Sequence, residues 1–199
     1  MLVIGLTGPT GAGKGTVAKL FASFGVQIID ADAVYHALLN PPSPCLDELT
    51  ARFGSSILNP DKTLNRQALG AIVFADQGAL ADLNAITHRY VMEQIRAELA
   101  HMRRAQVKVA LLDAPQLFEA GADRDCDVVV SVLADEERRL SRITQRDGIS
   151  PEAARKRMAA QLPDEFFRRN ASYIIENNQS PEQLTDAVQA ILSEIGGLP

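Results

Sequence analysis

Short apolar runs alternate along this chain with longer segments of helical periodicity. The runs are rich in Val, Ile and Leu and lie at residues 2–7, 26–29, 107–112, 128–133 and 173–175. Runs of this kind, separated by helical patterns, are typical of βαβ units whose strands form a parallel sheet buried on both faces. The pattern therefore predicts an α/β fold, with a five-stranded parallel sheet between two layers of helices.

The last predicted helix has the clearest boundaries. Ser180 and Gln183 have the spacing of a capping box, and Pro181 suits the first helical position. Gly196 and Gly197 are natural end signals. Between these limits the apolar positions follow a helical period: Leu184, Ala187, Val188, Ile191, Leu192 and Ile195. We expect this stripe to face the sheet.

Two stretches interrupt the alternation of strand and helix. Residues 31–105 separate the second and third strands by far more than one crossover helix, and their pattern predicts several helices. Residues 134–170 contain nine of the chain's 20 Lys and Arg residues. We therefore predict three parts: a core of residues 1–30, 106–133 and 171–199, a helical insert of residues 31–105, and a lid of residues 134–170.

The turn after the first strand carries the most specific motif. Residues 8–16 read Gly-Pro-Thr-Gly-Ala-Gly-Lys-Gly-Thr, and a helical stripe that we expect to face the core follows them: Val17, Leu20, Phe21 and Phe24. A buried strand, a glycine-rich turn and a helix are the context of a phosphate-binding loop (P-loop). Its backbone N–H groups point at phosphate oxygens, and Lys14 adds a positive charge for the β- and γ-phosphates. We expect a nucleoside triphosphate to bind Gly11, Ala12, Gly13, Lys14, Gly15 and Thr16.

Composition narrows the class of protein. The chain is 46% hydrophobic and 23% charged, which is ordinary for a globular domain. A net charge of −5 argues against a general nucleic-acid or membrane-surface binder. No apolar stretch is long enough for a signal peptide or a membrane span, and the two cysteines and three histidines lack metal-ligand spacing. We therefore expect a cytoplasmic protein whose partner is a small molecule.

Carboxylates follow two of the predicted strands. Asp30 and Asp32 come after the second strand, and Asp113 comes at the end of the third. The carboxyl ends of parallel strands meet at the ligand-binding edge of such a sheet. Phosphoryl transfer to a hydroxyl uses a carboxylate that accepts its proton, so we predict Asp32 as this base, with Asp30 as the alternative. Either residue can instead cap the next helix. Asp113 is predicted to hold Mg²⁺, directly or through water.

The arginine-rich stretch suits a lid over the phosphates. Arg142 and Arg146 are four residues apart and therefore share a helical face. Guanidinium groups there would neutralise charge in the transition state and exclude water. A solvated helix pair is the alternative, because nearby acidic residues balance many of these charges.

The order of motifs resembles the dephospho-CoA kinase family over almost the whole chain. The matching segments are the loop of residues 8–16, Asp30-Ala31-Asp32, Leu64–Leu69 with Phe74, Ile86–His88, Leu112–Glu119, Arg142–Gly148, Gln161 and Ile174–Asn178. The resemblance implies a transferase that phosphorylates the ribose 3′-hydroxyl of dephospho-CoA. ATP would be the donor and Mg²⁺ the metal, in the last step of coenzyme A biosynthesis. It also implies a nucleotide-kinase-like core, a helical substrate domain and an arginine-bearing lid.

The resemblance also implies roles for single residues. Asp32 would be the general base, and Arg66 and His88 would lie in or near the substrate region. Arg142 and Arg146 would be the lid arginines, and Asn177 would lie near the adenine end of ATP. Thr16 or water would replace the missing loop hydroxyl at Mg²⁺. We expect a monomer or a weak homo-oligomer.

Several positions depart from the family pattern. The departures are Gly15 in place of serine, Tyr35-His36 in place of Ala-Arg, Arg89 in place of proline, Gln116 in place of leucine, Arg139 in place of glutamine and Ser172 in place of aspartate. Two other functions therefore stay open. One is a nucleoside monophosphate kinase, whose loops favour the ending Gly13–Thr16. The other is an ATP-binding regulatory module.

Overall fold

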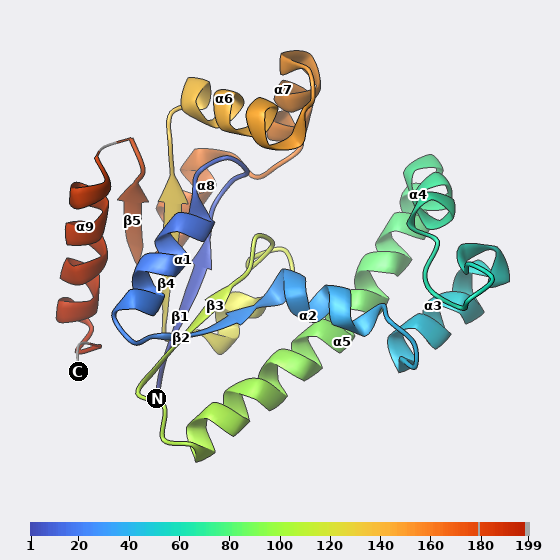
Figure 1. Cartoon of the computed structure of the whole chain (residues 1–199), viewed down its shortest axis with the longest axis horizontal. Helices are drawn as coiled ribbons and strands as arrows, with labels where there is room; N and C mark the ends of the chain where they lie inside the picture. The colour runs from blue at the N-terminus through green and yellow to red at the C-terminus, as the bar shows by residue number, and fades with distance from the viewer. Residues whose placement is uncertain (179, 198–199) are drawn as a thin grey trace. The chain divides into compact units, whose positions relative to one another are not determined.

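The computed structural model describes residues 1–178 and 180–197, and within them a five-stranded parallel sheet forms the centre of the fold (Figure 1). Its strands are β1 (Leu2–Thr7), β2 (Gln27–Asp30), β3 (Val109–Asp113), β4 (Val128–Leu133) and β5 (Tyr173–Glu176). They lie in the order β2-β3-β1-β4-β5, and every neighbouring pair is parallel. The predicted α/β fold is confirmed.

The second and third strands begin one or two residues later than predicted, and the second, third and fifth each end one residue later. The late starts have a local cause. In each case the first residue of the predicted strand is still hydrogen-bonded to the end of the preceding helix. Val26 donates its N–H to Phe21 O at 3.3 Å, and Val107 donates its N–H to Met102 O at 3.0 Å. With these bounds, both strands end on an aspartate.

Helices α1 (Lys14–Ser23) and α9 (Pro181–Glu194) cover one face of the sheet. Their apolar sides pack on alternate residues of the strands in one buried cluster, which includes Ile4, Leu6, Val17, Phe21, Leu111, Val130, Val132, Leu184, Val188 and Leu192. The predicted capping box of α9 is present. Burial of this cluster is the main stabilising contribution to this side of the sheet.

The opposite face of the sheet packs against α8 (Asp164–Asn170) and the segment after β3, which contains the 3-10 helix Ala122–Asp125. The approach is close at Gly5. A Cβ atom there would lie 2.9 Å from both Leu117 Cδ2 and Cys126 Sγ, so a larger residue would have to displace one of these side chains. Burial raises the pKa of the Cys126 thiol to about 12, which keeps it protonated and unreactive.

The chain divides into two compact units, one of Met1–Asp30 together with the chain from His101 onward, the other of Ala31–Ala100. The second unit is helical, as predicted. It contains α2 (Ala31–Leu38), α3 (Pro44–Phe53), the 3-10 helix Ser55–Ile57, α4 (Arg66–Ala75) and most of α5 (Gln77–Arg104). These elements enclose a core of their own, which includes Leu39, Leu49, Phe53, Ile57, Leu69 and Val73.

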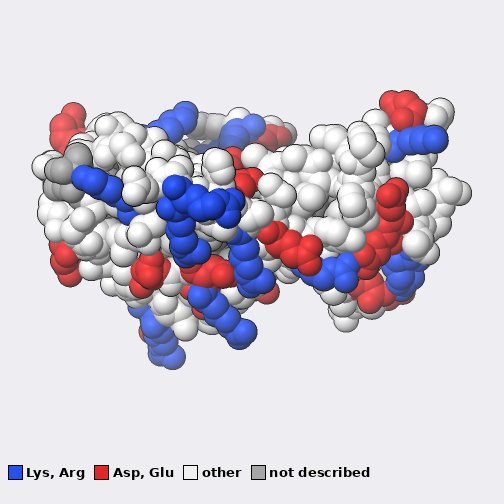
Figure 2. Space-filling view, turned by 90° about the horizontal axis from the view of Figure 1, so that it is seen from below, with Lys and Arg blue, Asp and Glu red and all other residues white. Residues whose placement is uncertain are grey.

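The arginine-rich segment belongs to the first unit. It forms α6 (Glu136–Asp147) and α7 (Pro151–Ala159), which lie side by side beyond the carboxyl ends of the strands (Figure 1), followed by α8. Both signs of charge occur on the face drawn in Figure 2. Across the described ranges, no helix has the length and apolar content that a membrane crossing needs.

Candidate functional site

The predicted phosphate loop joins β1 to α1 and depends on glycine at several positions. Gly11 and Gly13 have φ values of +77° and +97°, a region that L side chains rarely adopt. A Cβ atom on Gly13 would also lie 2.1 Å from Asn177 Nδ2. Helix α1 begins at Lys14, and the first N–H groups of a helix have no acceptor inside it. These groups and the positive end of the helix dipole make the loop an anion site.

Lys14 reaches across this loop. Its amino group donates to Gly8 O at 2.7 Å, and the side chain is half-buried. The positive charge therefore lies at the loop, where a bound triphosphate would present its β- and γ-phosphates.

Arg142 and Asn177 hold the outer side of the loop. Arg142 Nη1 donates to Gly11 O at 3.2 Å and Ala12 O at 3.1 Å, and Nη2 donates to Asn177 O at 3.1 Å. Asn177, only 9% exposed, donates from Nδ2 to Ala12 O at 2.7 Å. Arg142 is thus bound to backbone carbonyls here, and its action on the transferring group stays a prediction.

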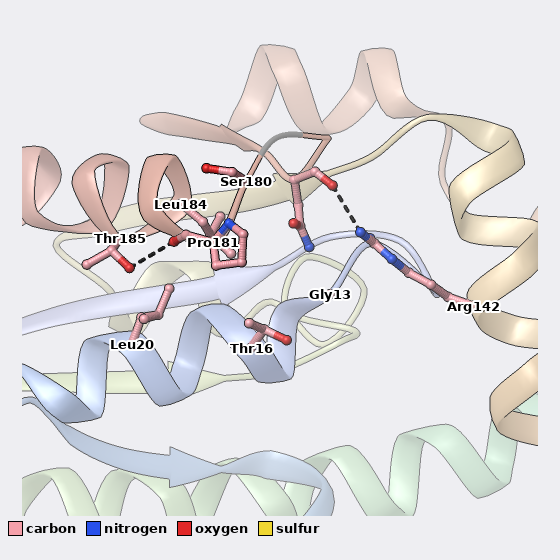
Figure 3. Close-up of a pocket in the computed structure, with 9 residues that line it drawn as sticks. Gly13, Thr16, Leu20, Arg142, Ser180, Pro181, Leu184 and Thr185 are labelled. Atoms are coloured by element: carbon pink, nitrogen blue, oxygen red, sulfur yellow. Dashed lines mark hydrogen bonds between the residues drawn. The ribbon is translucent and has the colours of Figure 1, made fainter.

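A cavity of about 360 Å³ opens beside the loop, between α1, α6 and the start of α9 (Figure 3). Leu20, Pro181 and Leu184 supply apolar surface, while Arg142 and Asn177 supply polar groups. Thr16 also lines this space. The nucleoside base of a triphosphate is flat and partly apolar, and it would fit a cavity of this kind beside the phosphate loop.

The sequence missed several residues of this cavity, since it assigns Leu20 and Leu184 to the core and Ser180 and Pro181 to a helix cap. A signal was present. Helix α9 follows β5, and a parallel sheet brings the carboxyl end of β5 to the same edge as the phosphate loop. Asn177, predicted near adenine, does line the cavity.

Two carboxylates end neighbouring strands at this edge. Asp30 and Asp113 are partners in the register of β2 and β3. Residues paired in this way project from the same face of a sheet. The part of the chain that the structure describes contains no group of three or more His, Cys, Asp or Glu side chains able to hold a metal ion. Two carboxylates suit Mg²⁺, which keeps several waters and binds through one or two carboxylates together with substrate phosphates.

Asp32 lies two residues beyond β2, in the first turn of α2, and its side chain is exposed. A carboxylate in the first turn of a helix also interacts favourably with the helix dipole. The exposed position leaves it accessible to a substrate hydroxyl, which is the property that a general base needs.

Within the helical unit, Arg66 is placed by a helix cap. Asn65 caps α4 by accepting from Ala68 N at 3.0 Å, and Arg66 is the first residue of that helix. Arg66 Nη2 lies 3.0 Å from His36 Nδ1. Because a guanidinium nitrogen only donates, the ring nitrogen accepts. The departure at His36 therefore supplies a partner for Arg66. His88 lies half-buried on α5.

Arg146 lies on the solvent side of α6, where its side chain is 62% exposed. It binds Asp147 twice, from Nε at 2.7 Å and from Nη2 at 3.0 Å, and Arg157 binds the same carboxylate. The hydrogen bond from Arg146 is the main cause that lowers the pKa of Asp147. The two predicted lid arginines therefore have different surroundings, one at the loop and one in an exposed ion-pair group.

Three other departures are accommodated locally. Ser172 bonds to Val129 through both its N–H, at 2.8 Å, and its Oγ, at 3.1 Å, which ties β5 to β4. Arg89 pairs with Glu48 and lies over the Tyr90 ring. A Cβ atom on Gly15 would meet nothing within 4 Å, so a serine fits there.

Comparisons with known proteins agree with this geometry. A family model described as dephospho-CoA kinase matches residues 2–183. A dephospho-CoA kinase of Syntrophotalea carbinolica is 40% identical over 195 residues, which cover 98% of this chain and 92% of the relative. The crystal structure of a Thermus thermophilus protein matches with a TM-score of 0.83 and 34% identity, covering 98% of this chain and 97% of the other. The corresponding values for a dephospho-CoA kinase from Campylobacter jejuni are 0.73 and 28%, with 97% and 96% covered.

Proposed function

This chain belongs to the dephospho-CoA kinase family, and we propose that it completes coenzyme A synthesis by moving the γ-phosphoryl group of ATP to the ribose 3′-hydroxyl of dephospho-CoA. The observation that carries the chemistry is the glycine loop of residues 8–16 with a cavity of about 360 Å³ beside it. The loop suits a triphosphate and the cavity suits its base.

On the donor side, Lys14 and the first N–H groups of α1 hold the β- and γ-phosphates. The apolar surface of Leu20, Pro181 and Leu184 takes one side of the adenine ring, with Arg142 and Asn177 beside it. Side chains outside the loop bind its carbonyl groups, so its N–H donors need little reorganisation during transfer.

On the acceptor side, Asp32 orients the ribose 3′-hydroxyl and takes its proton as the new P–O bond forms. Asp113, with Asp30 beside it, would hold Mg²⁺ through water, and Thr16 is the loop's candidate ligand. The ion would supply positive charge between the phosphates. Gly15 removes the loop hydroxyl that normally reaches it.

The helical insert, residues 31–105, would bind the acceptor. Arg66 is an exposed cation at the start of α4, and dephospho-CoA carries a diphosphate that such a group binds well. His88 would lie nearby in the same unit. Residues 134–170 would form the lid, with Arg146 as the exposed arginine that closes on the transferring group. We also expect a cytoplasmic enzyme that works as a monomer or weak homo-oligomer.

An acceptor panel tests the function. Purified protein with ATP and Mg²⁺ is supplied with dephospho-CoA, with AMP, or with no acceptor, and ADP is measured in each case. We expect ADP only with dephospho-CoA. ADP formation with AMP alone would favour the nucleoside monophosphate kinase, which the loop ending Gly13–Thr16 supports. Slow ATP consumption that no acceptor stimulates would favour the regulatory module.

A further inference from the structure

The tip of the phosphate loop is held by two side chains of the arginine-rich segment. Thr10 donates its N–H to Gln161 Oε1 at 2.8 Å. The carbonyl oxygen of the same residue accepts from Arg139 Nε at 3.0 Å. Arg139 lies near the start of α6, and Gln161 lies just after α7. Both backbone polar groups of one loop residue are therefore bound by side chains more than a hundred positions away in sequence.

Arg139 is built into the interior of the first unit. The residue is 6% exposed, and its Nη1 donates to Asp164 Oδ1 at 2.9 Å. A buried guanidinium needs such a counter-charge to offset the loss of hydration. The helix also touches the loop directly, since a Cβ atom on Gly11 would lie 2.8 Å from Arg139 O. The guanidinium thus links the loop to the start of α8.

Neither residue has a direct place in the nucleotide site. The cavity beside the loop is lined by Arg142, one helical turn further along α6, and not by Arg139 or Gln161. Their contacts with the loop are made to its backbone, at Thr10 for both residues and also close to Gly11 for Arg139.

We propose that Arg139 and Gln161 are positioning residues that preset the phosphate loop for ATP. A glycine-rich loop loses much conformational entropy when it is ordered. Fixing the peptide groups on both sides of Thr10 removes part of that loss from the binding step, which increases nucleotide affinity. The proposal rests on the proposed function only in that the loop binds a nucleotide.

The same contacts divide the lid. Arg139 lies near the first end of the predicted lid and Gln161 near its second end. If both contacts with Thr10 are kept, only the residues between Arg139 and Gln161 can move. That intervening part carries Arg146, Asp147 and Arg157, which form an exposed ion-pair group. The parts of the lid at Arg139 and Gln161 are therefore fixed to the phosphate loop.

Nucleotide binding by side-chain variants tests the proposal. Arg139→Met and Gln161→Met each remove one bond to Thr10. The matched control is Arg138→Met, because Arg138 is an exposed neighbour on α6 whose carboxylate partner, Asp135, lies 3.8 Å away. The Kd for ADP is measured by calorimetry, and KM is measured separately for ATP and for dephospho-CoA. Circular dichroism of each nucleotide-free variant checks its fold.

Each of the two variants should raise the Kd for ADP and the KM for ATP roughly tenfold, the usual effect of losing one such hydrogen bond. The KM for dephospho-CoA and all constants of Arg138→Met should stay within about twofold of the wild-type values. Arg139→Gln, whose amide still donates, should recover most of the ADP affinity. If Arg139→Met fails to fold, Gln161→Met decides the question.

Folded variants that bind ADP like the wild-type protein would overturn the proposal. So would an equal rise in KM for both substrates, because that is the effect of general destabilisation. A wild-type protein that ignores dephospho-CoA, while the variants still lose ADP affinity, would contradict the proposed acceptor and leave the positioning role supported.

Discussion

The phosphate loop and the arginine of the helical insert are held in very different ways. The carbonyl groups of Thr10, Gly11 and Ala12 all accept hydrogen bonds from buried or half-buried side chains. Arg66, in the insert, contacts His36, and both side chains are exposed. The loop would therefore be preset for a phosphate ligand, whereas Arg66 would depend on its proposed ligand for most of its order. Changes at the loop should lower ATP binding, and changes in the insert should affect the acceptor alone.

Asp32→Asn should cause the largest loss of kcat among these variants, and it should act only on the acceptor side. Removing a general base lowers kcat by roughly 10²–10⁴-fold. The Kd for ADP should not change, because the loop is intact. Steady-state kinetics and calorimetry give the two values. Asp30→Asn is the comparison variant: because Asp30 lies beside Asp113, a loss of kcat that additional Mg²⁺ restores leaves the base at Asp32, whereas a greater loss at saturating Mg²⁺ would move the base to Asp30.

Lys14→Ala should affect both binding and turnover on the donor side. Loss of one preorganised donor costs roughly 10²–10³-fold in kcat, and the nucleotide also loses a charge partner. ADP binding and kcat measured on the same preparation test this. Lys19→Ala, an exposed lysine of α1, is the matched control. Equal effects of the two substitutions would remove the special role of Lys14.

Arg66→Met should affect only the acceptor. Loss of a charge-assisted hydrogen bond to a phosphate raises the KM for dephospho-CoA by roughly tenfold or more. The Kd for ADP should be unchanged. Arg52→Met is the control in the same unit, since Arg52 pairs with Asp82 on an exposed surface. A matching rise in KM for ATP would break the proposed separation of donor and acceptor effects.

Gly15→Ser should have the smallest effect and should act through the metal. A Cβ atom at this position meets nothing within 4 Å, and the serine hydroxyl adds an oxygen ligand of the kind that Mg²⁺ prefers. We expect a few-fold lower Mg²⁺ concentration at half-maximal rate and no loss of Tm, because serine has a higher helix propensity than glycine. Gly15→Ala separates the hydroxyl from the helix propensity of the new residue. An identical Mg²⁺ titration in both variants would show that the hydroxyl contributes nothing.

Much of the loop follows from sequence because spacing alone determines its backbone. Gly11 and Gly13 adopt left-handed conformations that few other residues tolerate, and Lys14 begins the helix. The predicted strands followed from continuous apolar runs, since a parallel sheet is buried on both faces. Periodicity likewise predicted the buried stripe of α9.

The bonds that brace the loop could not be predicted in this way. Arg139 and Asp164 are far apart in sequence, and nothing in their spacing indicates that a buried ion pair would form. Arg142 carries the expected charge at the expected end of the sheet, but its hydrogen bonds depend on how closely α6 approaches the loop. Such contacts are decided by packing distances that sequence patterns do not contain.

The central claim is transfer to one particular hydroxyl, and the position of the new phosphate tests it most directly. The protein is incubated with ATP, Mg²⁺ and dephospho-CoA, and the product is examined by ³¹P NMR with proton coupling. We predict one new phosphate monoester, coupled to the ribose 3′ proton, formed in equal amount to ADP. A monoester at another position, or ADP and inorganic phosphate without a phosphorylated acceptor, would contradict the account.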